Sequence, residues 1–177
     1  RALLATAAFA GGKFRPDLIS AVHGIDVPEV LTGLQEAAAR GLVEARPGGE
    51  YAFLHDRIRE ALLEQDGRDG SAAAVHARIA AVLDTPAKSD GQVFEVAHHY
   101  VAAGAAAPGR AAIAACVAAG ELALRTYAPA KAVALFDHVL DLTPTPDARA
   151  LVSLGTALRQ TGQFSRAADM LTRALTV

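Results

Sequence analysis

The spacing of apolar residues near the N-terminus predicts three short helices. Apolar residues fill positions 2–10, and two glycines follow them. A second helix is expected over 16–23, because the proline at its start suits a first helical turn. Apolar residues then recur at helical spacing over 26–40. Asp26 and Glu29 are three residues apart, which predicts a capping box at the start of this third helix.

The pattern changes its period after the third helix. Residues 42–45 and 50–54 are predicted strands, and the sequence RPGG between them has turn chemistry. Another helix is expected over 55–64. Three short helices followed by a β-hairpin are the plan of a winged helix. We therefore expect a winged-helix domain over residues 1–64.

Further helices are expected between this domain and residue 109. Polar and turn-forming residues alternate there with apolar residues at helical spacing. The predicted segments are loops at 65–70 and 84–91, helices at 71–83 and 92–103, and a stretch of small residues at 104–109. We interpret 65–109 as linker helices.

The last part of the chain, 110–177, contains two copies of a repeat. The copies align when Gly120 is matched with Gly155 and one extra residue is allowed between them. Their small and apolar residues follow the tetratricopeptide pattern, in which small residues let paired helices nest closely. Gly155 is therefore predicted to face Ala167. Because each helix pair leaves an apolar face for the next, we expect a truncated tetratricopeptide-like solenoid and a mostly α fold class.

Composition agrees with closely packed helices and excludes several classes. Hydrophobic residues make up 52% of the chain, aromatic residues 5%, and there is no Trp. The net charge of −2 gives no overall attraction to nucleic acid or to an anionic membrane. No apolar run is long enough to span a bilayer, so no membrane partner is expected. The single Cys116 excludes an internal disulfide, which fits a reducing cytoplasmic location; we expect it to be a small buried thiol.

The sequence has no motif for catalysis. Positions 11–13 (GGK) lack the first glycine and the Ser or Thr of a phosphate loop. No nucleophile elbow is present. His98 and His99 are adjacent, so they point to different faces of a helix and do not form a metal-binding pair. We expect no catalytic residue, no metal site and no enzyme activity in this chain.

The predicted third helix would be the reading helix if a winged helix bound DNA here. Its charged side chains give a net charge of −2, from Asp26, Glu29, Glu36 and Arg40. A reading helix gains most of its affinity from phosphates, which an acidic helix repels. DNA binding by this segment is therefore not expected, although a DNA-binding winged-helix transcription factor fragment stays open as an alternative.

A short motif stands at the start of the fourth helix, within 53–62 (FLHDRIREAL). Leu54, His55 and Asp56 resemble the end of the winged helix in STAND ATPases. These are signalling proteins that include apoptosome and plant-resistance proteins and the large LuxR-type and kinase-linked bacterial regulators. Residues 75–80 (VHARIA) and 94–100 (FEVAHHY) also resemble the bacterial regulators, in which such helices lead into helical repeats.

The resemblance implies a nucleotide-sensing role for His55 and Asp56. In that family the histidine contacts the β-phosphate of ADP in the closed state, and Asp56 would cap the helix. The resemblance implies that the nucleotide-binding domain, with its ATP or ADP, lies upstream of Arg1 and is a partner of this segment. No cofactor is expected in the chain itself. The alternative for His55 is an ordinary histidine at a helix start.

The function that the resemblance implies is regulatory. The chain would be a non-catalytic, protein-interaction segment of a STAND-type signalling and transcriptional regulator. It would couple nucleotide state to a helical-repeat sensor. A pure tetratricopeptide scaffold is a further alternative.

The first helix of each repeat is expected to line a concave groove. Its candidate binding residues are Arg125, Arg149, Arg159 and Gln160. The planar guanidinium group of arginine binds carboxylates through two parallel hydrogen bonds, so we predict an acidic protein or peptide partner there. A solvated face, or a seam against a further repeat, is the alternative.

Overall fold

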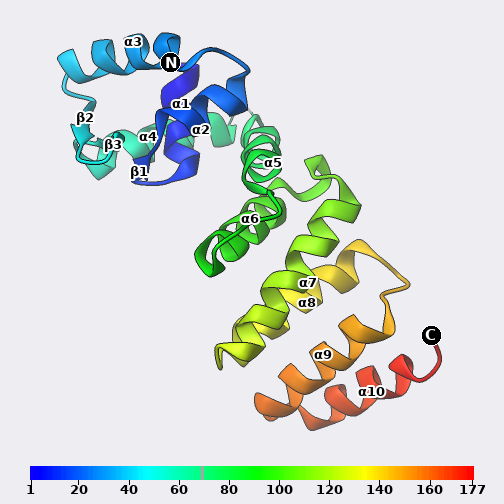
Figure 1. Ribbon diagram of the computed structural model, residues 1–177. Helices are drawn as coiled ribbons and strands as arrows, with labels where there is room; N and C mark the ends of the chain where they lie inside the picture. Colours follow the sequence, from blue (N-terminus) through cyan, green and yellow to red (C-terminus); the bar gives the residue numbers. More distant parts are fainter. Residues whose placement is uncertain (69) are drawn as a thin grey trace. The chain divides into compact units, whose positions relative to one another are not determined.

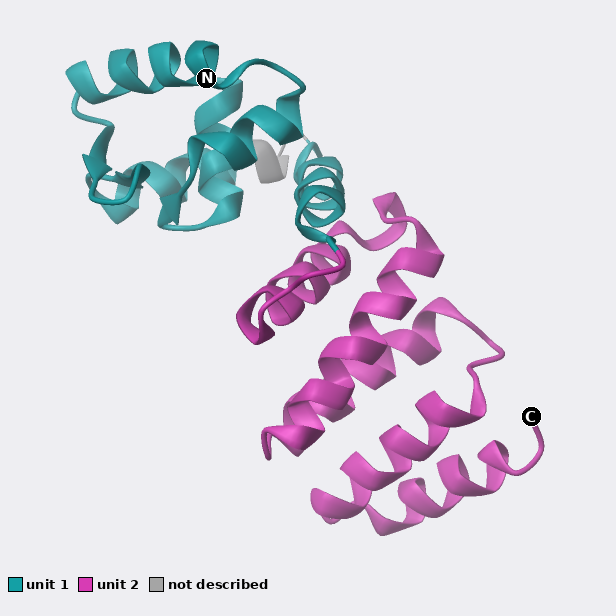
Figure 2. Ribbon diagram, in the orientation of Figure 1, with its two compact units in different colours: residues 1–85 teal, residues 86–177 magenta. Residues whose placement is uncertain are grey.

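The computed structural model describes residues 1–68 and 70–177, without the side chains of 66–68. The described residues form ten α-helices and three short strands, so the chain is mostly helical, as predicted (Figure 1). The chain divides into two compact units between Thr85 and Pro86 (Figure 2). Unit 1 comprises residues 1–85 and unit 2 residues 86–177.

Unit 1 contains the predicted short helices and the hairpin. Its elements are α1 (Ala2–Ala10), β1 (Lys13–Phe14), α2 (Pro16–His23), α3 (Val27–Ala39), β2 (Val43–Arg46), β3 (Glu50–Phe53), α4 (Asp56–Arg68) and α5 (Ala72–Leu83). The hairpin pairs Val43 with Phe53 and Arg46 with Glu50. Strand β1 was not predicted, because two residues are too short to show alternation. It pairs antiparallel with β3, which gives the sheet order β1-β3-β2.

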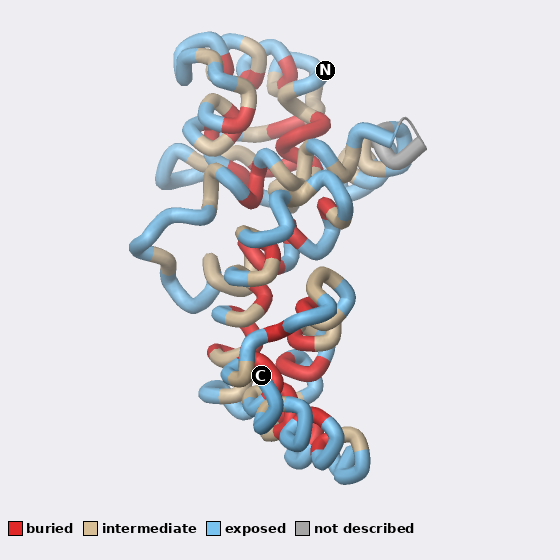
Figure 3. The backbone as a smooth tube through the Cα atoms, turned by 90° about the vertical axis from the view of Figure 1, so that its right-hand side faces the viewer, coloured by how far each residue is buried: buried red, intermediate tan, exposed pale blue. Residues whose placement is uncertain are grey.

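The core of unit 1 is built where apolar faces of the helices meet the sheet. Helices α2 and α3 bury residues at helical spacing, whereas α1 buries four consecutive residues, Ala5 to Ala8; buried stretches are red in Figure 3. On α3, Val30, Leu34 and Ala37 are buried at helical spacing, as the pattern predicted. Ile58 and Leu62 of α4 pack against the same core.

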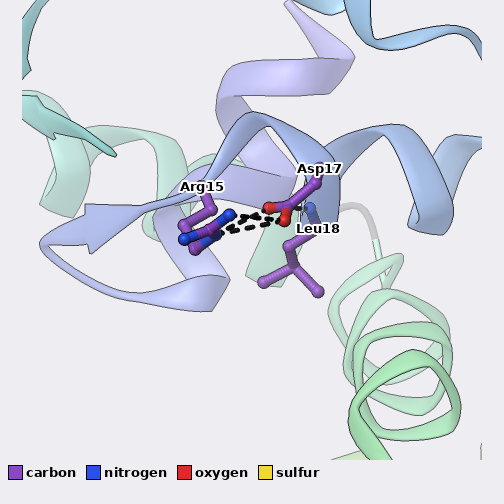
Figure 4. A network of polar contacts seen from close by, with 3 residues as sticks. All are labelled: Arg15, Asp17 and Leu18. Carbon is purple, nitrogen blue, oxygen red and sulfur yellow. Dashed lines mark hydrogen bonds and ion pairs between the residues drawn. The ribbon is translucent and has the colours of Figure 1, made fainter. Parts of the chain in front are cut away.

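The start of α2 is fixed by a polar network (Figure 4). Nη2 of Arg15 lies 2.9 Å from a carboxylate oxygen of Asp17, and Nε of Arg15 also donates to this carboxylate. Asp17 in turn accepts a 2.9 Å hydrogen bond from the backbone N–H of Leu18. Bonding from Arg15 lowers the pKa of the Asp17 carboxyl. Because both side chains are exposed, this pair orients the helix start and adds little to stability.

The capping box predicted at the third helix is wrong. Asp26 is the N-cap residue of α3, but its side chain makes no capping hydrogen bond. The carboxylate is exposed, so water solvates it and a bond to the backbone gains little. A capping box occurs instead before α6 (Asp90–Ala103), where Ser89 and Gln92 exchange hydrogen bonds.

The loop predicted at 65–70 is also wrong over most of its length. Helix α4 continues to Arg68, and residue 69 lies outside the described residues. The apolar pattern at helical spacing ends at Leu63, so the sequence did not indicate that the helix continues to Arg68. The predicted linker region 65–109 is divided, since α5 belongs to unit 1 and α6 to unit 2.

Helix α5 is tied to the rest of unit 1 through polar contacts. Arg78 donates a hydrogen bond to the backbone carbonyl of Val22 near the end of α2. Beside it, Nε2 of His23 lies 2.8 Å from the hydroxyl oxygen of Thr6. Burial, and then the charge of Arg78, lower the pKa of His23. These contacts involve side chains of three helices, so they serve the packing of unit 1.

Unit 2 consists of α6 and the helices that follow it. They are η1 (Gly104–Ala106), α7 (Gly109–Arg125), α8 (Pro129–Leu142), α9 (Ala148–Gln160) and α10 (Phe164–Ala174). From α6 onward, each α-helix packs on the next. The last two pairs repeat each other at an interval of 35 residues. Helix ends recur at Arg125 and Gln160, and helix starts recur at Pro129 and Phe164.

The turns within the two pairs have the same hydrogen bonds. In each turn, one N–H donates to the carbonyl five residues before it, and the preceding N–H donates to the carbonyl three residues before it. This pair of bonds defines a Schellman motif. The bonds are Ala128 to Ala123 and Gln163 to Leu158, both 2.8 Å, with Tyr127 to Leu124 at 3.3 Å and Gly162 to Arg159 at 3.2 Å. The motif requires a left-handed residue, which is Tyr127 (φ 56°) in the first turn and Gly162 (φ 77°) in the second.

Both pairs are nested at a glycine. A Cβ on Gly120 would lie 2.8 Å from the ring of Phe136, and a Cβ on Gly155 would lie 2.7 Å from Leu171. The same atom on Gly155 would lie 3.4 Å from the carbonyl oxygen of Ala167. The predicted approach of Gly155 to Ala167 is therefore confirmed.

Replacing Tyr127 by glycine is expected to stabilise the chain by about 1 kcal/mol. A residue with a Cβ in the left-handed region costs about 1–2 kcal/mol, and glycine removes most of that cost. The ring contributes little, since Tyr127 is 92% exposed. The denaturant midpoint of Tyr127→Gly should rise, whereas Tyr127→Ala, which keeps the strain, should stay near the wild type. Equal midpoints for Tyr127→Gly and Tyr127→Ala would contradict this explanation.

Candidate functional site

The residues of the first predicted site lie where β3 joins α4. The N–H of Leu54 donates to the carbonyl of Leu42 (3.1 Å), which fixes the exit of the strand beside the hairpin. The carbonyl of His55 accepts from the N–H of Ile58 (3.0 Å) and so opens the helix. His55 and Asp56 are both exposed. Within the described residues, neither side chain has a hydrogen bond or an ion pair, so the imidazole is available to a ligand or a partner.

The predicted capping role of Asp56 is wrong. Helix α4 begins at Asp56, so His55 occupies the position before the helix. The carboxylate lies in the first turn, near the positive end of the helix dipole, and no capping bond from it occurs in the described part of the chain. The helix is anchored elsewhere, because Nε of Arg59 donates to the carbonyl of Ala8 at the end of α1 (2.8 Å).

The second predicted site lies in unit 2, and one of its arginines is already paired. Nε and Nη2 of Arg149 lie 2.5 and 2.7 Å from the two carboxylate oxygens of Glu121. This fork joins α9 to α7 and raises the pKa of the Arg149 guanidinium. Arg149 therefore holds an internal carboxylate, not a free binding site.

The other residues of this site lie in the last turns of two helices. Arg125 ends α7, and Arg159 and Gln160 end α9. All three are exposed and have no side-chain partner among the described residues. The structure thus leaves two arginines and one amide for a ligand. Arginines in the last turn also interact favourably with the helix dipole, which is the ordinary structural role of such residues.

A groove that the sequence analysis missed lies between α6 and α8. It has a volume of about 660 Å³ and is lined by residues of these two helices. The lining residues are Phe94, Glu95, His98, Val101, Lys131, Ala134, Leu135, Asp137, His138 and Asp141. Their helical spacing within each segment was visible in the sequence, but nothing there indicated that the two segments face each other.

Polar contacts within the groove are unevenly distributed. The ammonium of Lys131 lies 3.4 Å from the centre of the Phe94 ring, a cation–π contact. Asp137 forms an ion pair with Arg166 of α10. Nε2 of His138 is buried and has no hydrogen-bond partner. A buried polar atom without a partner is rare and costs folding free energy.

Cys116 is not a reactive group. Its side chain is fully buried on α7, as predicted, and burial raises the pKa of the thiol to about 11. Because the thiolate is the nucleophilic form, this cysteine is inert at neutral pH.

Within the described ranges, no group of three or more His, Cys, Asp or Glu side chains is arranged to hold a metal ion. The rings of His98 and His99 meet edge to face at 5.4 Å. None of the helices described is both long and apolar enough to cross a membrane.

Comparison with protein-family models, curated proteins and solved structures finds no match to this chain.

Proposed function

We propose that the chain is a non-catalytic regulatory segment of a STAND-type signalling regulator. In this proposal, unit 1 is a winged helix that responds to a nucleotide-binding domain, and unit 2 is the start of a tetratricopeptide sensor that binds protein. The observation that carries it is the position of His55. The imidazole is exposed directly after the last strand of a small sheet and before a helix, which is where the Leu-His-Asp motif of the family lies.

The topology of unit 1 supports the proposal. The element order α1-β1-α2-α3-β2-β3 and the strand order β1-β3-β2 are those of a winged helix. Unit 2 supports it through the 35-residue interval, the two Schellman turns and the two nested glycines, which fit tetratricopeptide pairs.

The proposed mechanism is a two-state equilibrium biased by nucleotide. In the closed state, His55 would donate a hydrogen bond to the β-phosphate of ADP bound to the nucleotide-binding domain. Hydrogen bonds to charged groups contribute about 1.5–3 kcal/mol. ADP then stabilises the closed state relative to the open state. The size of this effect equals the difference between the binding free energies of ADP for the two states. Loss of the hydrogen bond between His55 and the β-phosphate would favour the open state, in which unit 2 can bind its protein partner.

The exposed face of α3 weighs against the DNA-binding alternative. Glu29 and Glu36 are exposed on this helix, and Nη1 of Arg40 lies 3.9 Å from a carboxylate oxygen of Glu36. The face that would meet phosphates is therefore acidic, and its one arginine is partly neutralised. A salt-sensitive complex between this chain and a DNA duplex would favour the alternative.

Replacing His55 by alanine in the intact regulator is expected to speed ADP release about tenfold. This factor corresponds to the loss of one hydrogen bond to a charged phosphate. Release can be followed by stopped-flow fluorescence of a labelled ADP. His55→Gln, whose amide still donates, should release ADP more slowly than His55→Ala. The melting temperature of the chain should not change, because the imidazole is exposed and has no hydrogen bond or ion pair within the described residues. Unchanged ADP release in His55→Ala would contradict the proposed sensing role.

A further inference from the structure

The two Schellman turns of unit 2 lie at the same end of its helix pairs. Each turn joins two helices that pack on each other, and α7 also contacts α9. Figure 1 shows both turns at the lower end of this unit. We call the segments 122–132 and 157–167, which hold the turns and the helix ends beside them, the turn edge. It contains no Asp or Glu, and its cationic residues are Arg125, Lys131, Arg159 and Arg166.

Two of these four cations are free to bind a ligand. Lys131 lies over an aromatic ring of α6, and Arg166 forms an ion pair with a carboxylate of α8. Arg125 and Arg159 are exposed and have no side-chain partner among the described residues. The turn edge therefore presents two guanidinium groups with no carboxylate in either of its segments.

The helix ends do not need these two arginines as caps. Carbonyls of the last helical turns accept hydrogen bonds from the N–H groups of the Schellman motifs. In addition, Oγ1 of Thr126 donates to the carbonyl of Leu122, and Oγ1 of Thr161 donates to the carbonyl of Leu158, both at 3.0 Å. The guanidinium groups are thus left for an acceptor outside this chain.

Exposed aromatic side chains occur at the same edge. Tyr127 is 92% exposed and Phe164 is 68% exposed. Among the large hydrophobic side chains that the structure describes as exposed, these two are the aromatic ones, and both lie in the turn edge. An aromatic ring in water leaves apolar area uncovered, which a partner can bury, and aromatic residues are enriched in protein interfaces.

The backbone of Tyr127 gives a reason to assign a role to its ring. The residue has φ 56°, where a side chain is strained, and the matching turn uses Gly162 instead. The strain brings no burial in return, because the ring is almost wholly exposed. Strained residues persist where function requires them. A contact outside the fold of this chain accounts for a tyrosine at this position.

We propose that the turn edge binds an acidic segment of a partner protein in which carboxylates flank an apolar side chain. The carboxylates pair with Arg125 and Arg159 through parallel hydrogen bonds, and the apolar side chain lies on the ring of Tyr127. This inference deepens the proposed function and rests on its protein-binding role for unit 2. It does not depend on nucleotide coupling by His55.

A single-stranded nucleic acid is the alternative occupant, because it also uses cations and aromatic rings. Its affinity grows with the number of phosphates that the protein neutralises, and two arginines of the turn edge are free. The net charge of −2 adds no attraction over a longer range. Two bidentate arginine–carboxylate pairs, by contrast, suffice for a short acidic peptide. The turn edge therefore favours the peptide.

The test uses the whole chain and fluorescein-labelled peptides. The reference peptide is Ala-Glu-Glu-Leu-Glu-Glu-Ala. In one control all four glutamates are replaced by glutamine, and in another the leucine is replaced by alanine. Fluorescence anisotropy should show the glutamine peptide binding at least about tenfold more weakly than the reference, and the alanine peptide about fivefold more weakly. A ten-nucleotide oligothymidylate should not displace the reference peptide.

Arginine variants connect this binding to the turn edge. Arg125→Gln and Arg159→Gln should each weaken the reference peptide about tenfold and leave the glutamine peptide unchanged. Arg110→Gln is the matched control, because Arg110 is an exposed arginine in the first turn of α7, at the opposite end of that helix. It should leave the affinity unchanged.

Tyrosine variants separate binding from stability. Tyr127→Phe keeps the ring and should bind the reference peptide as the wild type does. Tyr127→Ala and Tyr127→Gly remove the ring and should weaken binding about fivefold. Because Tyr127→Gly also relieves the strained backbone, its denaturant midpoint should rise while its affinity falls. A tyrosine with only a structural role would not give these opposite changes.

Several results would overturn the proposal. Equal affinities for the glutamate and glutamine peptides would remove the assigned charge recognition. Equal effects of Arg110→Gln and Arg125→Gln would place binding elsewhere, and unchanged binding in Tyr127→Ala would remove the role of the ring. Displacement of the peptide by oligothymidylate would assign the edge to nucleic acid. If no peptide binds while the chain still distinguishes ADP from ATP forms of the nucleotide-binding domain, this inference fails and nucleotide coupling stands.

Discussion

Replacing Phe136 by alanine is expected to lower the free energy of unfolding by about 3–5 kcal/mol. The ring is fully buried in the core of unit 2. It also fills the space that a side chain at Gly120 would need. Removing it leaves a cavity that helices α7 and α8 close only in part. Urea denaturation of the wild type and the variant measures this loss.

A second substitution makes the test specific for the nested helices. Gly120→Ala should destabilise the wild type, because the new Cβ would lie 2.8 Å from the Phe136 ring. In the Phe136→Ala background the same change should be neutral or stabilising, since alanine favours a helix by about 1 kcal/mol over glycine. Gly109→Ala in α7, which meets nothing within 4 Å, is the control and should not destabilise. Additive effects in the double variant would show that the two residues do not share the space.

Replacing Ala167 by leucine is expected to cost about 1–3 kcal/mol by overpacking. Ala167 is 4% exposed and lies against Gly155, where α10 approaches α9. The neighbouring Ala168 is exposed on the same helix. Ala168→Leu should therefore stay within about 0.5 kcal/mol of the wild type. Equal denaturant midpoints for the two variants would contradict the alignment of the repeat copies.

Periodicity predicted most helices and the hairpin, because burial of one face imposes a spacing that the sequence must carry. Val30, Leu34 and Ala37 recur at the helical spacing that predicted the third helix, and all three are buried. The same reasoning failed for β1, whose two residues have no period, and for residues 65–68, where the polar sequence QDGR indicated a loop. The capping box predicted at Asp26 was wrong for another reason. A capping residue type at a helix start does not require the capping bond, because water competes for an exposed carboxylate.

Candidate sites were harder to predict than helices, since they depend on which segments meet. Arg149 was predicted on the groove face, but its ion pair with Glu121, 28 residues away in sequence, forms only when α7 packs beside α9. Phe94 and Lys131 are likewise joined by packing and not by sequence distance. The unpartnered nitrogen of His138 is likewise a property of the packed structure, which the sequence does not show. By contrast, the prediction for His55 was made from a local motif and does not depend on how distant segments pack.

The most direct test of the proposed function measures binding between this chain and the nucleotide-binding domain of the regulator. Isothermal titration calorimetry of the two separate proteins, with the domain loaded with ADP or with a non-hydrolysable ATP analogue, gives both affinities. If the chain couples to nucleotide state, it should bind the ADP form at least about tenfold more tightly, a coupling free energy of about 1.4 kcal/mol. The difference should shrink in His55→Ala. Equal affinities for the two nucleotide forms would contradict the proposal.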